Sequence, residues 1–130
     1  MIKYKVKINL GIVTQGGATD GSVNYRVLVI NGNETPHLFI YDNQNIDERL
    51  DKLFCQLIDA HAEWSKKIFC GIENKDGVIN VNYICMIPHQ INNKAGSWIS
   101  IQDIISKESN IDENYKHIIN HISTCYAIQR

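Results

Sequence analysis

Apolar and polar residues alternate at the start of the chain, and this pattern predicts a first β-strand. Between residues 2 and 13 the apolar residues fall on every second position, with lysines and Asn9 between them. A period of two sends successive side chains to opposite faces of a sheet, so this strand should have one buried face. The same reasoning predicts strands at residues 23–30 and, after Pro36, in HLFIYD. The glycine-rich stretch TQGGATDGS before the second strand is expected to be a flexible loop.

Helical spacing replaces the alternation after these strands. Asn45 and Glu48 stand at the spacing of an N-cap and its reciprocal acid, and they predict a helix over about residues 46–66. One face of this helix carries the apolar positions Ile46, Leu50, Leu53, Phe54, Leu57, Ile58 and Trp64.

A hairpin and two more helices complete the predicted order. IFCGIE and VINVNYICMIP flank Asp76-Gly77, a strong hairpin signal. Ser100 and Asp103 have capping-box spacing and predict a short helix, and Asn110 caps a last amphipathic helix. The order is therefore β-β-β-α-β-β-α-α, an α+β arrangement in which strands pair mainly through hairpins.

Length and charge narrow the class of protein. A chain of 130 residues is expected to form a single domain, residues 1–130, and to fold alone or as a homodimer. The formal charge of -1 creates no overall positive field, so we expect neither a nucleic acid nor a membrane as partner. The first residues lack the apolar run of a signal peptide, and the expected location is cytoplasmic.

The order of the sequence segments along this chain resembles that of a Nudix domain. VNYRVLVI precedes the capped helix, a hairpin arm INVNYICMIP follows it, and SWISIQDI and NYKHIINHISTCY come last. The resemblance covers nearly the whole chain and implies a mixed β-sheet packed between helices. Members of that family hydrolyse nucleoside diphosphates linked to another group.

The catalytic motif of that family is missing its acids in this chain. The motif runs Gly, five residues, Glu, seven residues, Arg-Glu, apolar, any, Glu-Glu, any, Gly, apolar. With its first Glu on Glu48, the other fixed positions fall on Asp42, Gln56, Leu57, Ile58, Ala60, His61, Glu63 and Trp64. The chemistry needs carboxylates at i, i+3 and i+4, because together they hold divalent cations that neutralise the diphosphate and activate water. Leu57, Ala60 and His61 cannot replace that set.

Other residues offer weaker routes to catalysis. Asp59 and Glu63, four residues apart, could form a divergent carboxylate site with acids upstream, although a solvated helix face explains them as well. His117, His121 and Cys125 follow helical spacing without a further ligand that would complete a metal site. The cysteines share no CxxC spacing and are expected to be buried free thiols, at Cys55, Cys70, Cys85 and Cys125. We therefore predict no catalytic residue and no metal site.

The resemblance does imply residues around a ligand. Aromatic side chains could stack a base, and an arginine could hold phosphate through paired hydrogen bonds. Core packing is the alternative for Tyr83 and Trp98, and a solvent-facing position is the alternative for Arg26. The predicted ligand-binding residues are Arg26, Tyr41, Asp59, His61, Tyr83, His89 and Trp98.

The leading hypothesis is a catalytically inactive Nudix-like domain that serves as a binding or regulatory module for a nucleotide derivative, without a cofactor. A first alternative is a divergent hydrolase of nucleoside diphosphate derivatives, which would require Mg²⁺. A second is a protein-interaction scaffold without a ligand.

Overall fold

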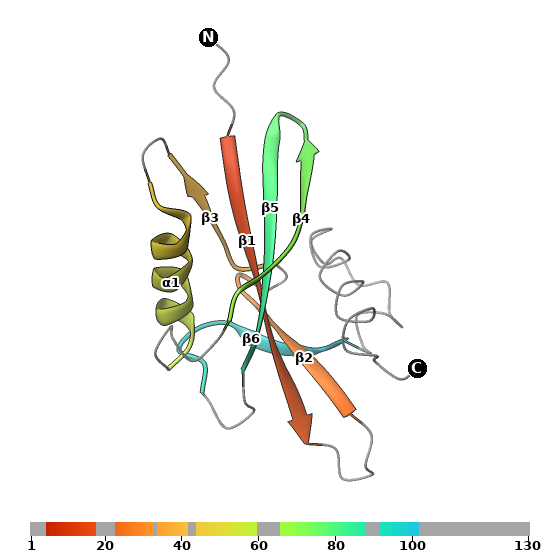
Figure 1. Ribbon diagram of the computed structural model, residues 1–130. Helices are drawn as coiled ribbons and strands as arrows, with labels where there is room; N and C mark the ends of the chain where they lie inside the picture. The colour runs from red at the N-terminus through yellow and green to blue at the C-terminus, as the bar shows by residue number, and fades with distance from the viewer. Residues whose placement is uncertain are drawn as a thin grey trace.

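Six strands and one helix make up the part of the chain that the computed structural model describes, which is residues 5–17, 23–32, 34–41, 44–59, 66–87 and 92–101 (Figure 1). In chain order they are β1 (Lys5–Gly17), β2 (Val23–Val29), β3 (His37–Ile40), α1 (Ile46–Leu57), β4 (Ile68–Lys75), β5 (Val78–Ile87) and β6 (Ser97–Ser100).

The long strand β1 organises the sheet. Its strand order is β4-β5-β1-β2-β6, and β3 pairs separately with the first half of β1. On one side β1 runs parallel to β5, while on the other it pairs antiparallel first with β3 and then with β2. The mixed sheet with a helix against it confirms the predicted α+β fold class.

The hairpin between β4 and β5 forms where the sequence predicted it. Asp76 and Gly77 both have positive φ angles, 53° and 77°. Two central residues with positive φ make the turn whose twist matches that of the flanking strands, and glycine adopts this conformation without steric cost.

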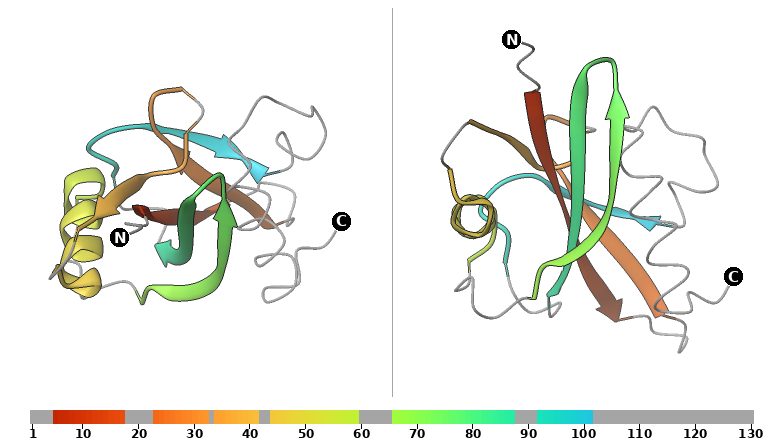
Figure 2. Two further views of the ribbon diagram at one scale, coloured as in Figure 1. Left: turned by 90° about the horizontal axis from the view of Figure 1, so that it is seen from above. Right: turned by 45° about the horizontal axis from the view of Figure 1, so that its top comes forward.

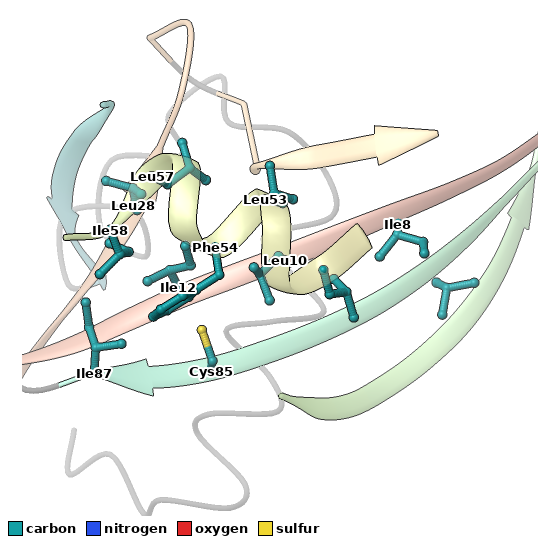
Figure 3. Packing of buried hydrophobic residues seen from close by; sticks show 12 residues of the cluster. Ile8, Leu10, Ile12, Leu28, Leu53, Phe54, Leu57, Ile58, Cys85 and Ile87 are labelled. Carbon is teal, nitrogen blue, oxygen red and sulfur yellow. The ribbon is translucent and has the colours of Figure 1, made fainter. Parts of the chain in front are cut away.

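The main core lies between α1 and one face of the sheet (Figure 3). Alternate residues of β1, which are Ile8, Leu10 and Ile12, are fully buried there. From α1, Phe54 is fully buried against them, and Cys85 of β5 completes this side. The period of two in β1 and the helical period in α1 thus bring both apolar faces into one cluster.

A second cluster lies on the opposite face of the sheet. It contains Val13, Val27, Val29, Ile84 and Ile101, all buried. Apolar side chains are thus buried on both faces of the sheet, and Figure 2 shows α1 against one of these faces. The helix predicted after Asn110 lies outside the described residues, as do the positions that follow Ile101 in the short helix predicted near Asp103.

Two strand boundaries differ from the prediction. β1 continues to Gly17, so the start of the predicted loop belongs to a strand in which Gln15, Gly16 and Gly17 pair with β2. Residues 97–100 form β6, which pairs antiparallel with β2 and was not predicted. Four residues are too few for a clear alternation, and backbone pairing with β2 defines this strand.

The helix α1 is shorter than predicted. It ends at Leu57, whereas the sequence pattern continues to about residue 66. Ile58 has extended backbone angles and forms a bridge with Asn93. The apolar spacing persists past the helix because Ile58 still points into the core, so the pattern alone could not locate the end. Among the described residues, no helix is long and apolar enough to cross a membrane.

Candidate functional site

The N-terminus of α1 is capped as predicted. The side-chain Oδ1 of Asn45 accepts a hydrogen bond from the backbone N–H of Glu48 at 3.2 Å. Asp47 and Glu48 place negative charge in the first turn, where it interacts favourably with the unpaired N–H groups of the helix. The two acids at this end therefore have a structural role.

The other end of α1 is held by a segment distant in sequence. The backbone N–H of Lys94 donates to the carbonyl of Leu57 at 2.6 Å, and its Nζ donates to the carbonyl of Cys55 at 3.0 Å. The last carbonyls of a helix have no partner within it, and a lysine there also balances their negative potential. No basic residue lies in the last turn of α1, so Lys94 supplies that charge from outside.

Asn93 organises the segment that caps α1. Its Nδ2 donates to the carbonyls of Ala95 and Gly96 at 3.1 and 2.9 Å, and its Oδ1 accepts from Trp98 Nε1 at 3.1 Å. Gly96 has a φ of 82°, and an added Cβ there would lie 2.5 Å from the carbonyl oxygen of Val29. The end of α1, the capping loop and β6 are thus joined by specific contacts.

The end of α1 lies before two of the three positions at which the motif requires acids. Leu57 is the last residue of α1, and Ala60 and His61 lie outside the described residues. Of the two acids in the divergent site, Asp59 lies two positions after the end of α1, and Glu63 is outside the described residues. A shift of one turn toward the N-terminus would place the three positions on Leu53, Gln56 and Leu57, which are all helical but carry no acid.

No other register of the motif places its three acids within α1 either. From Ile46 to Leu57, no set at i, i+3 and i+4 consists of three acids. Asp51, the acid nearest the helix centre, forms a 2.6 Å ion pair with Lys67. Within the described part of the chain, no group of three or more His, Cys, Asp or Glu residues could hold a metal ion. The donors of α1 therefore do not fit the magnesium site of the expected chemistry.

Two of the predicted ligand-binding residues lie at opposite ends of the sheet. Arg26 is exposed on β2 opposite Thr14, and Tyr41 is exposed just after Ile40, which pairs with Val6. Eight residues of β1 separate these two pairings, which corresponds to roughly 25 Å along a strand. The base-stacking and phosphate-holding roles predicted for Tyr41 and Arg26 therefore cannot meet on one compact ligand.

Tyr83 and Trp98 lie on the α1 side of the sheet and pack against the main core while remaining partly exposed. The ring of Tyr83 meets that of Phe69 edge to face, with centroids 5.8 Å apart. Burial raises the pKa of the Tyr83 phenol, and the negative charge of Asp47 raises it further. This phenol is therefore a neutral hydrogen-bonding group near the start of α1.

Of the three remaining predicted ligand-binding residues, only Asp59 lies in the described part of the chain. Asp59 is exposed beyond the end of α1, and its backbone N–H donates to the carbonyl of Asn92 at 2.9 Å. His61 and His89 lie outside the described residues, as do His117, His121 and Cys125. Of the described cysteines, Cys85 is buried as predicted, whereas Cys55 and Cys70 are only half-buried.

The raised pKa of Tyr83 predicts a loss of stability at alkaline pH. Below the ordinary tyrosine pKa of 10.0 the phenol is neutral in both states. As pH rises above that value the unfolded chain ionises first, so the free energy of unfolding falls until the folded phenol also ionises. Urea unfolding at about pH 9 and about pH 11 should show a larger loss for the natural protein than for Tyr83→Phe. Equal losses would contradict this assignment.

A buried asparagine cluster was missed by the sequence analysis. On the sheet face away from α1, Asn9 Nδ2 donates to Asn80 Oδ1 at 3.2 Å and to Asn82 Oδ1 at 3.0 Å. All three side chains are buried. A signal was present, because Asn80 and Asn82 alternate with apolar residues just as Asn9 does, which places each on the polar side of its strand. The sequence could not show that the two strands are neighbours.

No family model matches this sequence, and no curated protein matches it. Solved structures do match its fold. A mutT/nudix family protein from Listeria innocua is 10% identical with a TM-score of 0.74, and the match covers 95% of this chain and 97% of that one.

Two further solved structures agree over most of their length. An Ap4A hydrolase from C. elegans, solved as a binary complex, is 11% identical with a TM-score of 0.63, covering 94% of this chain and 97% of that chain. The NUDIX domain of Shewanella oneidensis NrtR, solved with ADP ribose, is 11% identical with a TM-score of 0.59, covering 92% and 86% respectively. Because the sequence identities are so low, these matches establish the fold of this chain alone.

Proposed function

We propose that this chain, which has a Nudix-like fold, binds a nucleotide derivative without hydrolysing it. The observation that carries the proposal is the composition of α1. The solved structures that share the fold of this chain include an Ap4A hydrolase and a domain solved with ADP ribose, and these support a ligand of the same chemical class. No three acids of α1 stand at the i, i+3 and i+4 spacing of the motif, and no group of three or more described His, Cys, Asp or Glu residues could hold the cations that hydrolysis of a diphosphate requires.

The buried face of α1 supports the same proposal. Leu53 and Leu57 occupy two of the three positions in the shifted register, and both are buried among apolar side chains. An acid at either position would be withdrawn from water and would lack a hydrogen-bonding partner, which is costly. The packing of α1 therefore favours a structural helix over a metal-binding one.

Tyr83 is the predicted ligand-binding residue whose surroundings best suit this function. Its neutral phenol can donate and accept hydrogen bonds, and its partly exposed ring lies beside Phe69. Rings of this kind stack on nucleobases and fix their orientation. We assign the base of a nucleotide derivative to the ring of Tyr83.

A thermal-shift screen against nucleotides and sugar nucleotides, with and without Mg²⁺, tests the proposal. A ligand at about 100 times its Kd should stabilise the folded state by about 2.7 kcal/mol, and we expect this shift to be independent of Mg²⁺. Tyr83→Phe should reduce the shift, because it keeps the ring but loses the hydroxyl.

An assay of ADP-ribose hydrolysis with Mg²⁺ separates the alternatives. The protein should release no more product than a variant with Asp59→Ala and Glu63→Ala. Hydrolysis by the natural protein well above that variant would instead support the divergent hydrolase. Absence of any thermal shift across the panel would support a protein-interaction scaffold and contradict binding.

A further inference from the structure

Two exposed aromatic residues, Phe39 and Tyr41, stand two positions apart on the sheet face away from α1. Leu38 and Ile40 of β3 pack against the main core on the α1 side, so His37 and Phe39 between them face the other way. The rings of His37 and Phe39 meet edge to face at 6.2 Å. Phe39 is 38% exposed, and Tyr41, two positions further, is 72% exposed. Large apolar rings exposed on a sheet face are candidates for contact with a ligand.

Lysines of β1 lie beside these aromatic residues. Lys7 pairs directly with Phe39 in the antiparallel ladder. The ladder ends at Val6 and Ile40, and Lys5 and Tyr41 are the next residues beyond it on the two segments. Directly opposed residues of such a ladder share a face and have Cβ atoms about 5 Å apart. The result is two successive rows, each consisting of one aromatic residue and one lysine.

The spacing of the two rows follows from strand geometry. Residues two apart in a strand repeat at about 7 Å. An extended single strand of nucleic acid advances by a similar length per nucleotide, and it presents one base and one phosphate at each step. The two rows therefore match two consecutive nucleotides, with rings for the bases and ammonium groups for the phosphates.

The charge of this face differs from that of the whole chain. The row of Lys5 continues through Val78 to Lys75, and the row of Lys7 continues through Asn80 to Glu73. These two described rows thus carry three lysines and one acid, although the formal charge of the chain is -1. A local excess of positive charge attracts phosphates regardless of the total.

His37 ends the aromatic line with a hydrogen-bonding group. Its Nδ1 lies 2.9 Å from the backbone carbonyl of Thr35. A carbonyl only accepts, so Nδ1 carries the hydrogen and Nε2 of the neutral ring is an acceptor. An acceptor at the end of a stacking surface could receive a hydrogen bond from a base N–H group.

We propose that this face, formed by Phe39, Tyr41, Lys5 and Lys7, binds two consecutive nucleotides of a single-stranded nucleic acid. The bases stack on Phe39 and Tyr41, and the phosphates lie at Lys7 and Lys5. This site is on the opposite side of the sheet from α1 and goes beyond the proposed function. It also replaces the expectation, drawn from the net charge, that nucleic acid is not a partner.

Fluorescence anisotropy with a labelled oligouridine strand and the full chain tests this site. Tyr41→Ala should weaken binding by about 5-fold to 100-fold, the loss expected for one stacked base, whereas Tyr41→Phe should retain it. Phe39→Leu reports on the first row while keeping an apolar side chain in the sheet. Lys5→Gln and Lys7→Gln should each reduce the slope of log affinity against log salt by about 0.7, as expected for one lost phosphate contact on a single strand.

Matched variants on the other side of the sheet provide the controls. Ile72→Ala removes an apolar side chain of comparable exposure from β4, and Lys52→Gln removes an exposed lysine from α1. Neither should change the affinity or the salt slope. Equal effects of Tyr41→Ala and Ile72→Ala, or a natural protein that does not bind the strand, would overturn the proposal. Uridine monophosphate that binds as tightly as the strand would overturn the assignment of two rows.

Discussion

Replacing Phe54 by alanine is expected to lower the free energy of unfolding by about 3–5 kcal/mol. The ring is fully buried between α1 and the sheet, where it packs in the cluster that contains Leu10, Ile12 and Cys85. Lys67 Nζ also lies 5.1 Å from the ring centroid, a favourable cation–π distance. Alanine would leave a cavity that the surrounding strands cannot fill. Urea unfolding measured by circular dichroism gives the loss directly.

Phe69→Ala is the matched control, because the same substitution is made at a ring that is 51% exposed on β4. It should cost about 1 kcal/mol or less, mostly through the lost contact with Tyr83. A stability near 5–15 kcal/mol is typical of a domain, so the Phe54 variant would lose a large fraction of it. Equal losses in the two variants would show that α1 does not depend on Phe54 for its attachment.

Replacing Asn9 by leucine is expected to cost about 2–5 kcal/mol, although the two side chains have similar shapes. Leucine removes the Nδ2 group that donates to Asn80 and Asn82, and it leaves two buried oxygens without those hydrogen bonds. An unsatisfied buried acceptor costs about 1–3 kcal/mol. The loss should therefore exceed that of an ordinary change between residues of similar volume, and thermal or urea unfolding would measure it.

A double-mutant cycle with Asn82→Leu separates the hydrogen bond from packing. Removing both partners leaves fewer orphaned polar groups, so the double variant should be less destabilised than the sum of the single variants. A coupling energy of about 1 kcal/mol or more would fit a direct hydrogen bond. Strict additivity would contradict it. Since Asn9 pairs with Asn82 across the parallel β1–β5 ladder, this contact also helps to fix the register of the two strands.

Local features of the fold were predictable because they depend on residues close in sequence. The Asn45 cap needs only Glu48 three residues later, and the β4–β5 turn needs only Asp76 and Gly77. The alternation in β1 identified the face that packs against α1, but the prediction of a single buried face was wrong, because Asn9 and Val13 on the other face are buried too. Such signals are short-range, so the rest of the chain does not have to be known.

The candidate site was predicted less well, because its residues meet only through distant strands. Arg26 and Tyr41 fit the chemistry of a nucleotide, but β1 holds them at opposite ends of the sheet. Tyr83 was predicted, while its raised pKa depends on burial and on Asp47, which is far away in the sequence. The asparagine cluster was missed for the same reason, since the partners of Asn9 on β5 lie 71 and 73 residues further along the chain.

The sequence by itself determined the types of the main elements, the cap of α1, the β4–β5 turn and the absence from α1 of three acids at the i, i+3 and i+4 spacing of the motif. Each of these follows from side-chain chemistry within a few residues. Only the tertiary structure decided where α1 ends, because Lys94 and Asn92, from another segment, form hydrogen bonds with Leu57 and Asp59. It also decided that β1 runs beside β5 and that Lys7 lies next to Phe39. Those pairings depend on the free energy of contacts between distant segments, and local patterns do not contain that information.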